Sequence, residues 1–283
     1  MRGADFSGTN TVEAAIGHTH DPTTVAEARR AQFDEAFASG ATIAVGANAS
    51  RSLVDALKST GRHPRFVPLD AWSAPIPGDA VDGLVLGSIS GQIPPLETTL
   101  PVVIDVGDGG VTTAASAPID HDALARVHGD IAIGIRAAAG FDTLPSRRAD
   151  HSLLTGVVVR LPGPADPTAF FAYASGEGTG IEWLATRQPL HPHARQHLTR
   201  SDLERSSHHL ARLFHVPVGD RFTTEEVDHA VLGVVKAAEY LGWRWWQDPD
   251  LVDDYALFLD AEYGPDHEAF RPAFRDDRSG ASG

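Results

Sequence analysis

Three absences limit the chemistry open to this chain of 283 residues. It has no cysteine, which excludes disulfide bonds, thiolate nucleophiles and cysteine-ligated metal sites together. Its 23 basic residues include only two lysines, Lys58 and Lys236, so any reaction that needs a lysine amine has two candidates. No apolar run approaches ~20 residues, the length that crosses a bilayer, and Met1–Asp5 lacks the apolar core of a signal peptide. We therefore expect a cytoplasmic protein.

Charge and composition predict an acidic, globular chain. Asp and Glu number 38 against 23 Lys and Arg, which gives a formal net charge of −15. An acidic surface repels phosphate backbones and anionic lipid, so we expect neither nucleic acid nor a membrane as a partner. Hydrophobic residues make up 42% of the sequence, which is enough for a sizeable core in one large domain or two ordinary ones.

The first half of the chain alternates short apolar runs with helical patterns, which predicts α/β layers. Strands are expected at 41–45, 65–70, 83–87 and 100–104, with a further strand at 129–136. Helices are expected from a capping box at Thr24 to Ser39, at 53–57 and at 121–127.

A shift in composition over residues 137–150 predicts a domain boundary. Beyond it we expect a strand at 153–161, helices at 166–174 and 206–214, and an amphipathic helix from the capping box Thr223–Glu226 to Leu241. The prediction is an N-terminal arm (1–21), a reduced large α/β domain with a mainly parallel sheet (22–150), a smaller α+β domain (151–272) and a flexible tail (273–283).

Two carboxylates follow the most apolar of the predicted strands. The run Leu100–Ile104 ends abruptly in Asp105, and Asp108 comes three residues later between glycines. Ligands bind beyond the carboxyl ends of buried parallel strands, although capping or solvated loop acids would give the same pattern. Asn48 and Ser50 precede a predicted helix in the same way, which fits either an anion site or an ordinary turn.

Five segments, in the same order along the chain, resemble the DegT/DnrJ/EryC1/StrS family of sugar aminotransferases. They are Pro64–Asp70, Gly91–Gln92, Leu100–Asp105, Gly180–His191 and Phe214–Asp228. The resemblance implies a fold-type I structure, a role in amino-sugar or secondary-metabolite biosynthesis, pyridoxal phosphate as the cofactor, and a dimer whose active sites lie at the interface.

The resemblance also implies roles for individual residues. Asp105 matches the aspartate that pairs with the pyridine nitrogen and keeps the ring protonated. Asp108 stands where the family has a glutamine near the ring hydroxyl, and a carboxylate there would repel the phenolate form of the cofactor. The remaining residues implied for the pocket are Asn48 and Ser50 at the family's phosphate turn, Gln92, Trp183 and His191.

The largest departure from the family is its Schiff-base lysine. The corresponding region, Ala132–Phe141, holds Arg136 and no lysine. A guanidinium stays protonated and is not a nucleophile, so arginine cannot replace the amine. Lys58 and Lys236 both lie far from the expected position in the sequence. We therefore expect no covalent cofactor and no transamination by this chain alone, while Asp108 also counts against non-covalent pyridoxal phosphate.

Fourteen histidines raise the question of a metal site. The densest groups are His191-Pro192-His193 with His197, and the pair His18 and His20. A metal site needs converging ligands with supporting hydrogen bonds, and the resemblance accounts for His191 without one. We expect no metal.

Three functions remain open on the sequence. The first is a degenerate aminotransferase homologue in small-molecule biosynthesis, assembled as a homodimer. The second is a lysine-free subunit that completes the active site of a lysine-containing aminotransferase in a heterodimer. The third is an enzyme that needs no pyridoxal phosphate and uses Asp105, Asp108 and His191 for acid–base work.

Overall fold

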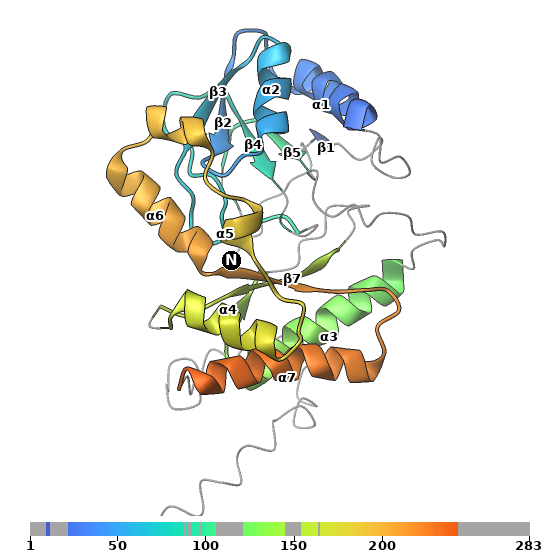
Figure 1. Cartoon of the computed structure of the whole chain (residues 1–283). Helices are drawn as coiled ribbons and strands as arrows, with labels where there is room; N and C mark the ends of the chain where they lie inside the picture. The colour runs from blue at the N-terminus through green and yellow to red at the C-terminus, as the bar shows by residue number, and fades with distance from the viewer. Residues whose placement is uncertain are drawn as a thin grey trace, which may run out of the picture.

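The computed structural model places two sheets one above the other, each with its own covering helices (Figure 1). It describes residues 10–11, 22–87, 89, 92–94, 96, 98–105, 121–144, 154–163 and 165–242. The predicted tail (273–283) and Asp108 lie outside these residues, as does the predicted arm (1–21) except for Asn10 and Thr11.

The first sheet is parallel throughout and has the strand order β1-β5-β4-β2-β3. Its strands are β1 (Asn10–Thr11), β2 (Thr42–Gly46), β3 (His63–Val67), β4 (Gly83–Gly87) and β5 (Val102–Asp105). All four residues of β5 are buried, and the strand lies between β1 and β4. This confirms the prediction of a buried parallel strand that ends at Asp105.

Helices α1 (Pro22–Ala36) and α2 (Arg51–Ser59) cover one face of the first sheet (Figure 1). Alternation along the strands puts Val45, Val85 and Val103 on this face, where they pack with Phe33 of α1 and Leu57 of α2. The alternate strand residues form a separate core on the opposite face: Ala44, Val67, Leu84, Leu86, Val102 and Ile104.

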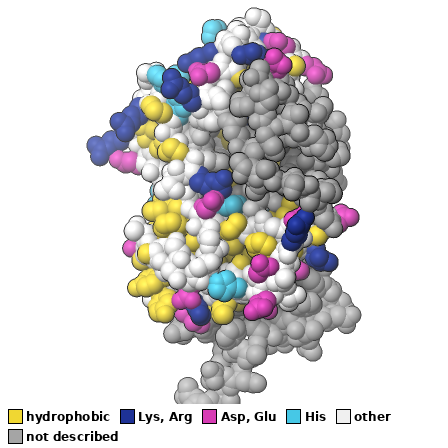
Figure 2. Space-filling model, turned by 45° about the vertical axis from the view of Figure 1, so that its right-hand side comes forward, with side chains coloured by type: hydrophobic (Ala, Val, Ile, Leu, Met, Phe, Trp, Pro, Cys, Tyr) yellow, Lys and Arg dark blue, Asp and Glu magenta, His cyan; other side chains and the backbone are white. Residues whose placement is uncertain are grey.

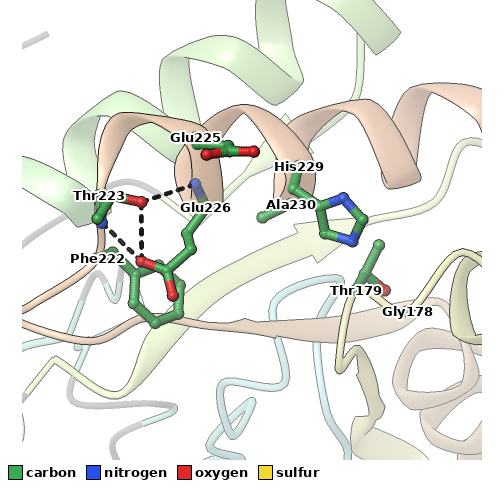
Figure 3. A pocket seen from close by; sticks show the side chains of 8 residues that line it. All are labelled: Gly178, Thr179, Phe222, Thr223, Glu225, Glu226, His229 and Ala230. Carbon is green, nitrogen blue, oxygen red and sulfur yellow. Dashed lines mark hydrogen bonds between the residues drawn. The ribbon is translucent and has the colours of Figure 1, made fainter.

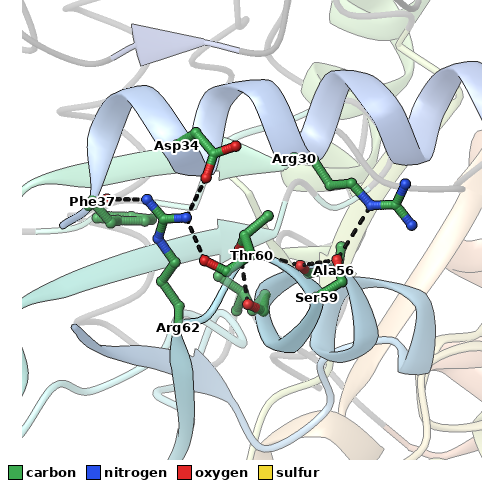
Figure 4. Close-up of polar contacts among 8 residues, drawn as sticks. Arg30, Asp34, Phe37, Ala56, Ser59, Thr60 and Arg62 are labelled. Carbon is green, nitrogen blue, oxygen red and sulfur yellow. Dashed lines mark hydrogen bonds and ion pairs between the residues drawn. The ribbon is translucent and has the colours of Figure 1, made fainter. Parts of the chain in front are cut away.

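A buried arginine ties α1 to the end of α2. The Arg62 side chain is 5% exposed and donates hydrogen bonds to the Asp34 carboxylate and to the backbone oxygens of Phe37 and Thr60 (Figure 4). A guanidinium has five N–H donors, so it can satisfy acceptors from both helices at once. The two helices therefore hold a fixed position over the sheet.

The second sheet is antiparallel, with the strand order β6-β7-β9-β8. Its strands are β6 (Asp142–Thr143), β7 (Gly156–Arg160), β8 (Glu182–Trp183) and β9 (Leu213–Pro217). Helices α3 (His121–Ala139), α4 (Pro167–Gly176) and α7 (Thr224–Tyr240) cover one face of it. α3 and β6 belong to this layer although both precede the boundary predicted near residue 150.

The amphipathic helix predicted from the capping box at Thr223 to Leu241 is confirmed as α7. Thr223 accepts a hydrogen bond from the Glu226 amide and the Glu226 carboxylate accepts one from the Thr223 amide, which is the predicted capping box. Ala230, Val234 and Ala238 are buried along the inner side of the helix. A helix with such an apolar stripe gains its stability from packing on a sheet.

Three predictions of the type or the bounds of an element were wrong. Residues 129–136 were predicted as a strand but continue α3, because Val127, Ile131 and Ile135 recur every four residues and are all buried. The helix predicted at 206–214 is α6 (Arg200–Ala211), which ends before Leu213 begins the buried strand β9. The capping box at Thr24 was also misplaced, since α1 begins at Pro22.

The segment between β8 and β9 leaves the second sheet and packs against the first. It contains α5 (Leu184–Arg187), the 3-10 helix η1 (Pro192–Gln196) and α6. Ala194 and Leu210 are buried in the same core as Phe66 of β3. In addition, the Leu69 amide donates to Ser206 Oγ over 3.0 Å. Residues far apart in the sequence therefore share one hydrophobic core.

Candidate functional site

Asp105, at the carboxyl end of β5, is held by an arginine from α1. Arg29 Nε donates to Asp105 Oδ1 and Arg29 Nη2 donates to Asp105 Oδ2, each over 3.0 Å. The two side chains are 2% and 5% exposed. Parallel hydrogen bonds of this kind fix both carboxylate oxygens in one plane with the guanidinium. Arg29 is thus the residue that sequence reasoning missed at this site.

The ion pair extends by hydrogen bonds to the turn before α2. Arg29 Nη1 donates to Ser52 Oγ over 3.1 Å, and Ser52 Oγ lies 3.0 Å from Ser50 Oγ. Ser50 is the N-cap of α2 and accepts from the Leu53 amide. Two predicted site residues, Asp105 and Ser50, are therefore connected through Arg29 and Ser52.

Asn48, Ser50 and His191 line one cavity of about 630 Å³ between α2 and residues 187–193. Asn48 uses its side-chain amide to join two segments, because Nδ2 donates to Ser73 Oγ over 2.9 Å and to Gln188 Oε1 over 3.2 Å. The sequence prediction that these three residues share a pocket is consistent with this placement, while Asp105 does not line the cavity.

The His191 ring is fixed on the wall of this cavity. It stacks on Phe66 with centroids 4.7 Å apart, and its Nδ1 accepts the His193 amide over 3.1 Å at the start of η1. Burial lowers the pKa of His191, and the neighbouring His193 and Lys58 lower it further. These shifts favour the neutral ring, and because Nδ1 accepts a hydrogen bond, the proton of the neutral ring lies on Nε2.

The other predicted pocket residues lie elsewhere. Trp183 donates from Nε1 to the Ala211 oxygen over 2.8 Å and stacks on Phe214 in the core of the second sheet. Gln92 is fully buried, and its Nε2 donates to the Leu144 oxygen over 3.2 Å. The structure gives both residues packing roles, and neither is among those that line the described cavities.

A second cavity, of about 570 Å³, lies beside the start of α7 (Figure 3). His229 of α7 lies beside Thr179 in this cavity, whereas the Glu226 side chain turns back toward Thr223. Hydrogen bonds from the Thr223 amide and hydroxyl lower the pKa of Glu226, because they favour the charged carboxylate. Glu226 thus serves as the partner in the capping box, and no predicted site residue lies in this cavity.

Comparisons with known proteins identify the fold. No protein-family model and no curated protein sequence matches this chain. Among solved structures, the aminotransferase TlmJ from Streptoalloteichus hindustanus matches with a TM-score of 0.53 at 12% identity, over 77% of this chain and 85% of that one. Helicobacter pylori PseC, an aminotransferase involved in the biosynthesis of pseudoaminic acid, matches with 0.52 at 9% identity, over 77% and 85%. This chain has a sugar-aminotransferase fold.

A third match extends the comparison to cofactor-bound forms. Spr1654 from Streptococcus pneumoniae, named as a candidate sugar aminotransferase, matches in its PLP-form with a TM-score of 0.55 at 9% identity. The alignment covers 77% of this chain and 86% of that one. The fold-type I aminotransferase-like α/β fold expected from the sequence is therefore confirmed, and at such identities the likeness concerns the fold.

The described residues do not fit pyridoxal phosphate in the way that the sugar-aminotransferase resemblance implies. Both oxygens of Asp105, the expected partner of the ring nitrogen, already accept hydrogen bonds from Arg29. Lys236 lies on α7 and pairs with Glu177 over 2.8 Å. Lys58 is an exposed residue of α2 that lines the cavity near His191.

The described part of the chain offers neither a cluster of metal ligands nor a membrane-spanning helix. No group of three or more His, Asp or Glu side chains there is placed to hold a metal ion. His18 and His20 lie outside the described residues. Among the described helices, none is both long and apolar enough to cross a membrane.

Proposed function

We propose that this chain is an aminotransferase-like protein of small-molecule biosynthesis that does not perform pyridoxal phosphate transamination by itself. The fold shared with TlmJ and PseC supports the biosynthetic setting. The observation that carries the proposal is the Arg29–Asp105 ion pair, since the expected ring-nitrogen carboxylate is engaged by the protein's own cation. A buried pair of this kind is costly to separate.

The distribution of lysines supports the same proposal. Transamination needs a lysine amine that can become neutral and attack a carbonyl carbon. Lys236 has its pKa raised by the hydrogen bond and the charge of Glu177, which favours the unreactive ammonium form. Lys58 lies on an exposed helix surface, and its cavity is lined by neither Arg29 nor Asp105.

Borohydride trapping tests the proposal directly. The full chain is incubated with pyridoxal phosphate, reduced, and analysed by intact mass and peptide mapping. We expect no stoichiometric adduct. The variants Lys58→Ala and Lys236→Ala serve as matched controls, because they locate any labelled amine. A single adduct that forms stoichiometrically and disappears in one of these variants would overturn the proposal.

The acid–base alternative receives less support from the geometry. Asp105 is 5% exposed and accepts hydrogen bonds from Arg29 on both oxygens, so a substrate proton would have to reach a buried, ion-paired carboxylate. His191 lines a cavity that Asp105 does not line. Asp108, the third group of that hypothesis, lies outside the described residues.

A further inference from the structure

An open groove of about 900 Å³ lies between η1 and α6. The buried residues of α6 are Ser206 and Leu210, and the residues of α6 that line the groove lie on another side of the helix, where they recur every three or four positions. They are Arg200, Leu203, Glu204, Ser207, His208 and Ala211. Together with Arg195 of η1, they give the groove both apolar and cationic side chains.

Cations predominate around this groove although the whole chain is acidic. Residues 187–212 contain five arginines against two acids, Asp202 and Glu204, in a chain of formal net charge −15. Arg195 forms no ion pair with any side chain in the described part of the chain. Arg200 pairs with Glu204 over 2.7 Å, but both side chains are largely exposed, and such a pair contributes at most about 1 kcal/mol. Both arginines are therefore available to another anion.

The surface of the molecule shows such a gathering of cations. Lys and Arg side chains (dark blue) and His side chains (cyan) lie together at the upper left of the face shown in Figure 2. Cations concentrated against an acidic background favour an anionic partner. Because the groove is also lined by apolar side chains, we expect that partner to combine carboxylates with apolar groups.

A segment of this composition follows the described part of the chain. Residues 247–270 contain eight Asp and Glu and no Lys or Arg. Large apolar residues are interspersed among these acids, for example Leu251, Tyr255 and Phe258. The segment lies outside the described residues, which end at Gly242. Its charge and its apolar content are both complementary to those of the groove.

A short series of contacts leads from the end of α7 to the groove. Tyr240 of α7 stacks on Tyr173 of α4 with ring centroids 4.8 Å apart. Two residues earlier on α4, Phe171 packs on Trp183 with centroids 5.7 Å apart. Trp183 Nε1 donates over 2.8 Å to the oxygen of Ala211, which lines the groove. The described chain therefore ends only a few side-chain contacts away from the groove.

We propose that the acidic segment 248–263 of this chain docks in the groove between η1 and α6, with its carboxylates at Arg195 and Arg200 and its apolar side chains at Leu203. The nine residues 243–251 span about 30 Å when extended, which is enough to follow α4 from the end of α7 to the groove. A tethered segment has an effective concentration in the millimolar range, so even a weak contact is largely formed.

Docking would change the surroundings of the cavity beside α2. The groove and that cavity share three lining residues, Leu190, His191 and Pro192. The docked segment would therefore bring negative charge next to the cavity. The inference goes beyond the proposed function and does not depend on it.

Paramagnetic broadening on the full chain tests the proposal, because a protein without cysteine accepts a spin label at one chosen position. Gln196→Cys places the label on η1 and Ala31→Cys places it on α1, and both positions are exposed and uncharged. η1 contacts β3 and α1 contacts β5, and β4 and β2 lie between these strands. We expect the label at position 196 to broaden the amide NMR signals of residues 248–263, and the label at position 31 to leave them unchanged.

Paired arginine variants measure the contribution of charge to docking. Arg195→Gln with Arg200→Gln removes two cations of the groove, and Arg30→Gln with Arg221→Gln removes two exposed arginines elsewhere, so the net charge changes equally. The first pair should weaken docking about fivefold and reduce the broadening accordingly, whereas the second should change docking by less than about twofold. Added salt should weaken docking in the wild type.

Three results in the single chain would overturn the proposal: no broadening from position 196, equal broadening from positions 196 and 31, or equal effects of the two arginine pairs. A mixture of spin-labelled chains with isotope-labelled chains that carry no spin label tests a second copy as the donor of the segment. Broadening between chains in that mixture would mean docking between copies and would also overturn the proposal. None of these measurements involves pyridoxal phosphate, so they can fail independently of borohydride trapping.

Discussion

At the scale of single residues, Arg29 determines what the carboxylate at the end of β5 can do. Arg29, Phe33 and Phe37 are spaced four apart in the sequence and are all buried. This spacing puts a charged residue on the apolar face of α1. An arginine in such a position needs a buried anion. The sequence therefore indicates that Arg29 forms a buried ion pair, but it does not indicate that the partner is Asp105.

A double-mutant cycle measures the Arg29–Asp105 pair. We expect Arg29→Met or Asp105→Leu alone to lower the free energy of unfolding by about 3–5 kcal/mol, because each removes one partner of a buried ion pair. The double variant should lose clearly less free energy of unfolding than the two single variants lose together. Urea unfolding provides the measurement, with the exposed pair Arg200–Glu204 as a control that should change by less than about 1 kcal/mol. Strict additivity at positions 29 and 105 would contradict the structure.

A buried histidine should make stability depend on pH. Burial lowers the pKa of His128 from 6.5 to about 4, and the side chain is 3% exposed. Between pH 4 and pH 6.5 the unfolded chain binds more protons at His128 than the folded chain does. The contribution of neutral His128 to the free energy of unfolding is therefore fully present above about pH 6.5 and is lost as the pH falls toward 4. The loss attributable to this residue is on the order of 3 kcal/mol.

Urea unfolding at several pH values tests the His128 prediction. His128→Gln should flatten the pH dependence in this window, whereas His208→Gln, at an exposed position of α6, should leave it unchanged. Burial also lowers the pKa of His191, His197, His209 and His215, so some dependence should persist. The same slope in wild type and His128→Gln would rule out this role for the residue.

At the scale of elements, the sequence predicted best where the pattern and the packing agree. β4 was predicted with its observed bounds, and α7 was recognised from its capping box and apolar stripe. The strand predicted at 129–136 was wrong because Ile131-Ala132-Ile133 looks like a short apolar strand in the sequence. In the fold these residues belong to α3, whose packing partner α7 is distant in the sequence. Asn48, Ser50 and His191 line one cavity, whereas the partner of Asp105 comes from α1, which no local pattern around Asp105 indicates.

Two glycines of α3 should respond oppositely to alanine. A Cβ on Gly134 would lie 2.7 Å from Val231 Cγ2 on α7, whereas one on Gly129 would meet nothing within 4 Å. We expect Gly134→Ala to destabilise the fold by about 1–3 kcal/mol through overpacking. Gly129→Ala should stabilise it by about 0.5–1 kcal/mol through helix propensity.

Thermal and urea unfolding of the two alanine variants measure the expected loss of stability at Gly134 and the expected gain at Gly129. Adding Val231→Ala to Gly134→Ala removes the obstructing methyl groups and should reduce the combined loss below the sum of the single changes. Equal effects of the two glycine substitutions would mean that α3 and α7 do not pack at Gly134.

At the scale of the whole molecule, the chain crosses between its two sheets more than once. The segment 184–211 leaves the second sheet, packs on the first and returns as β9. Polar contacts accompany the crossing, since His197 Nδ1 accepts the Phe66 amide over 2.9 Å and Gln92 Nε2 donates to the Leu144 oxygen over 3.2 Å. The two sheets should therefore unfold as one cooperative unit, a property that local sequence patterns do not reveal.

Hydrogen exchange with a substitution in the crossing segment tests this cooperativity. Leu210 is 2% exposed on α6 and packs into the first core, so Leu210→Ala should cost about 2–5 kcal/mol. Leu232→Ala is the matched control, because Leu232 is 50% exposed on α7 and should be nearly neutral. If the sheets are coupled, exchange of amides in β2 and in β7 rises together in Leu210→Ala. Faster exchange in β2 with unchanged protection in β7 would instead mean that the first sheet opens alone, and the crossing segment would then be a connection between independently stable halves.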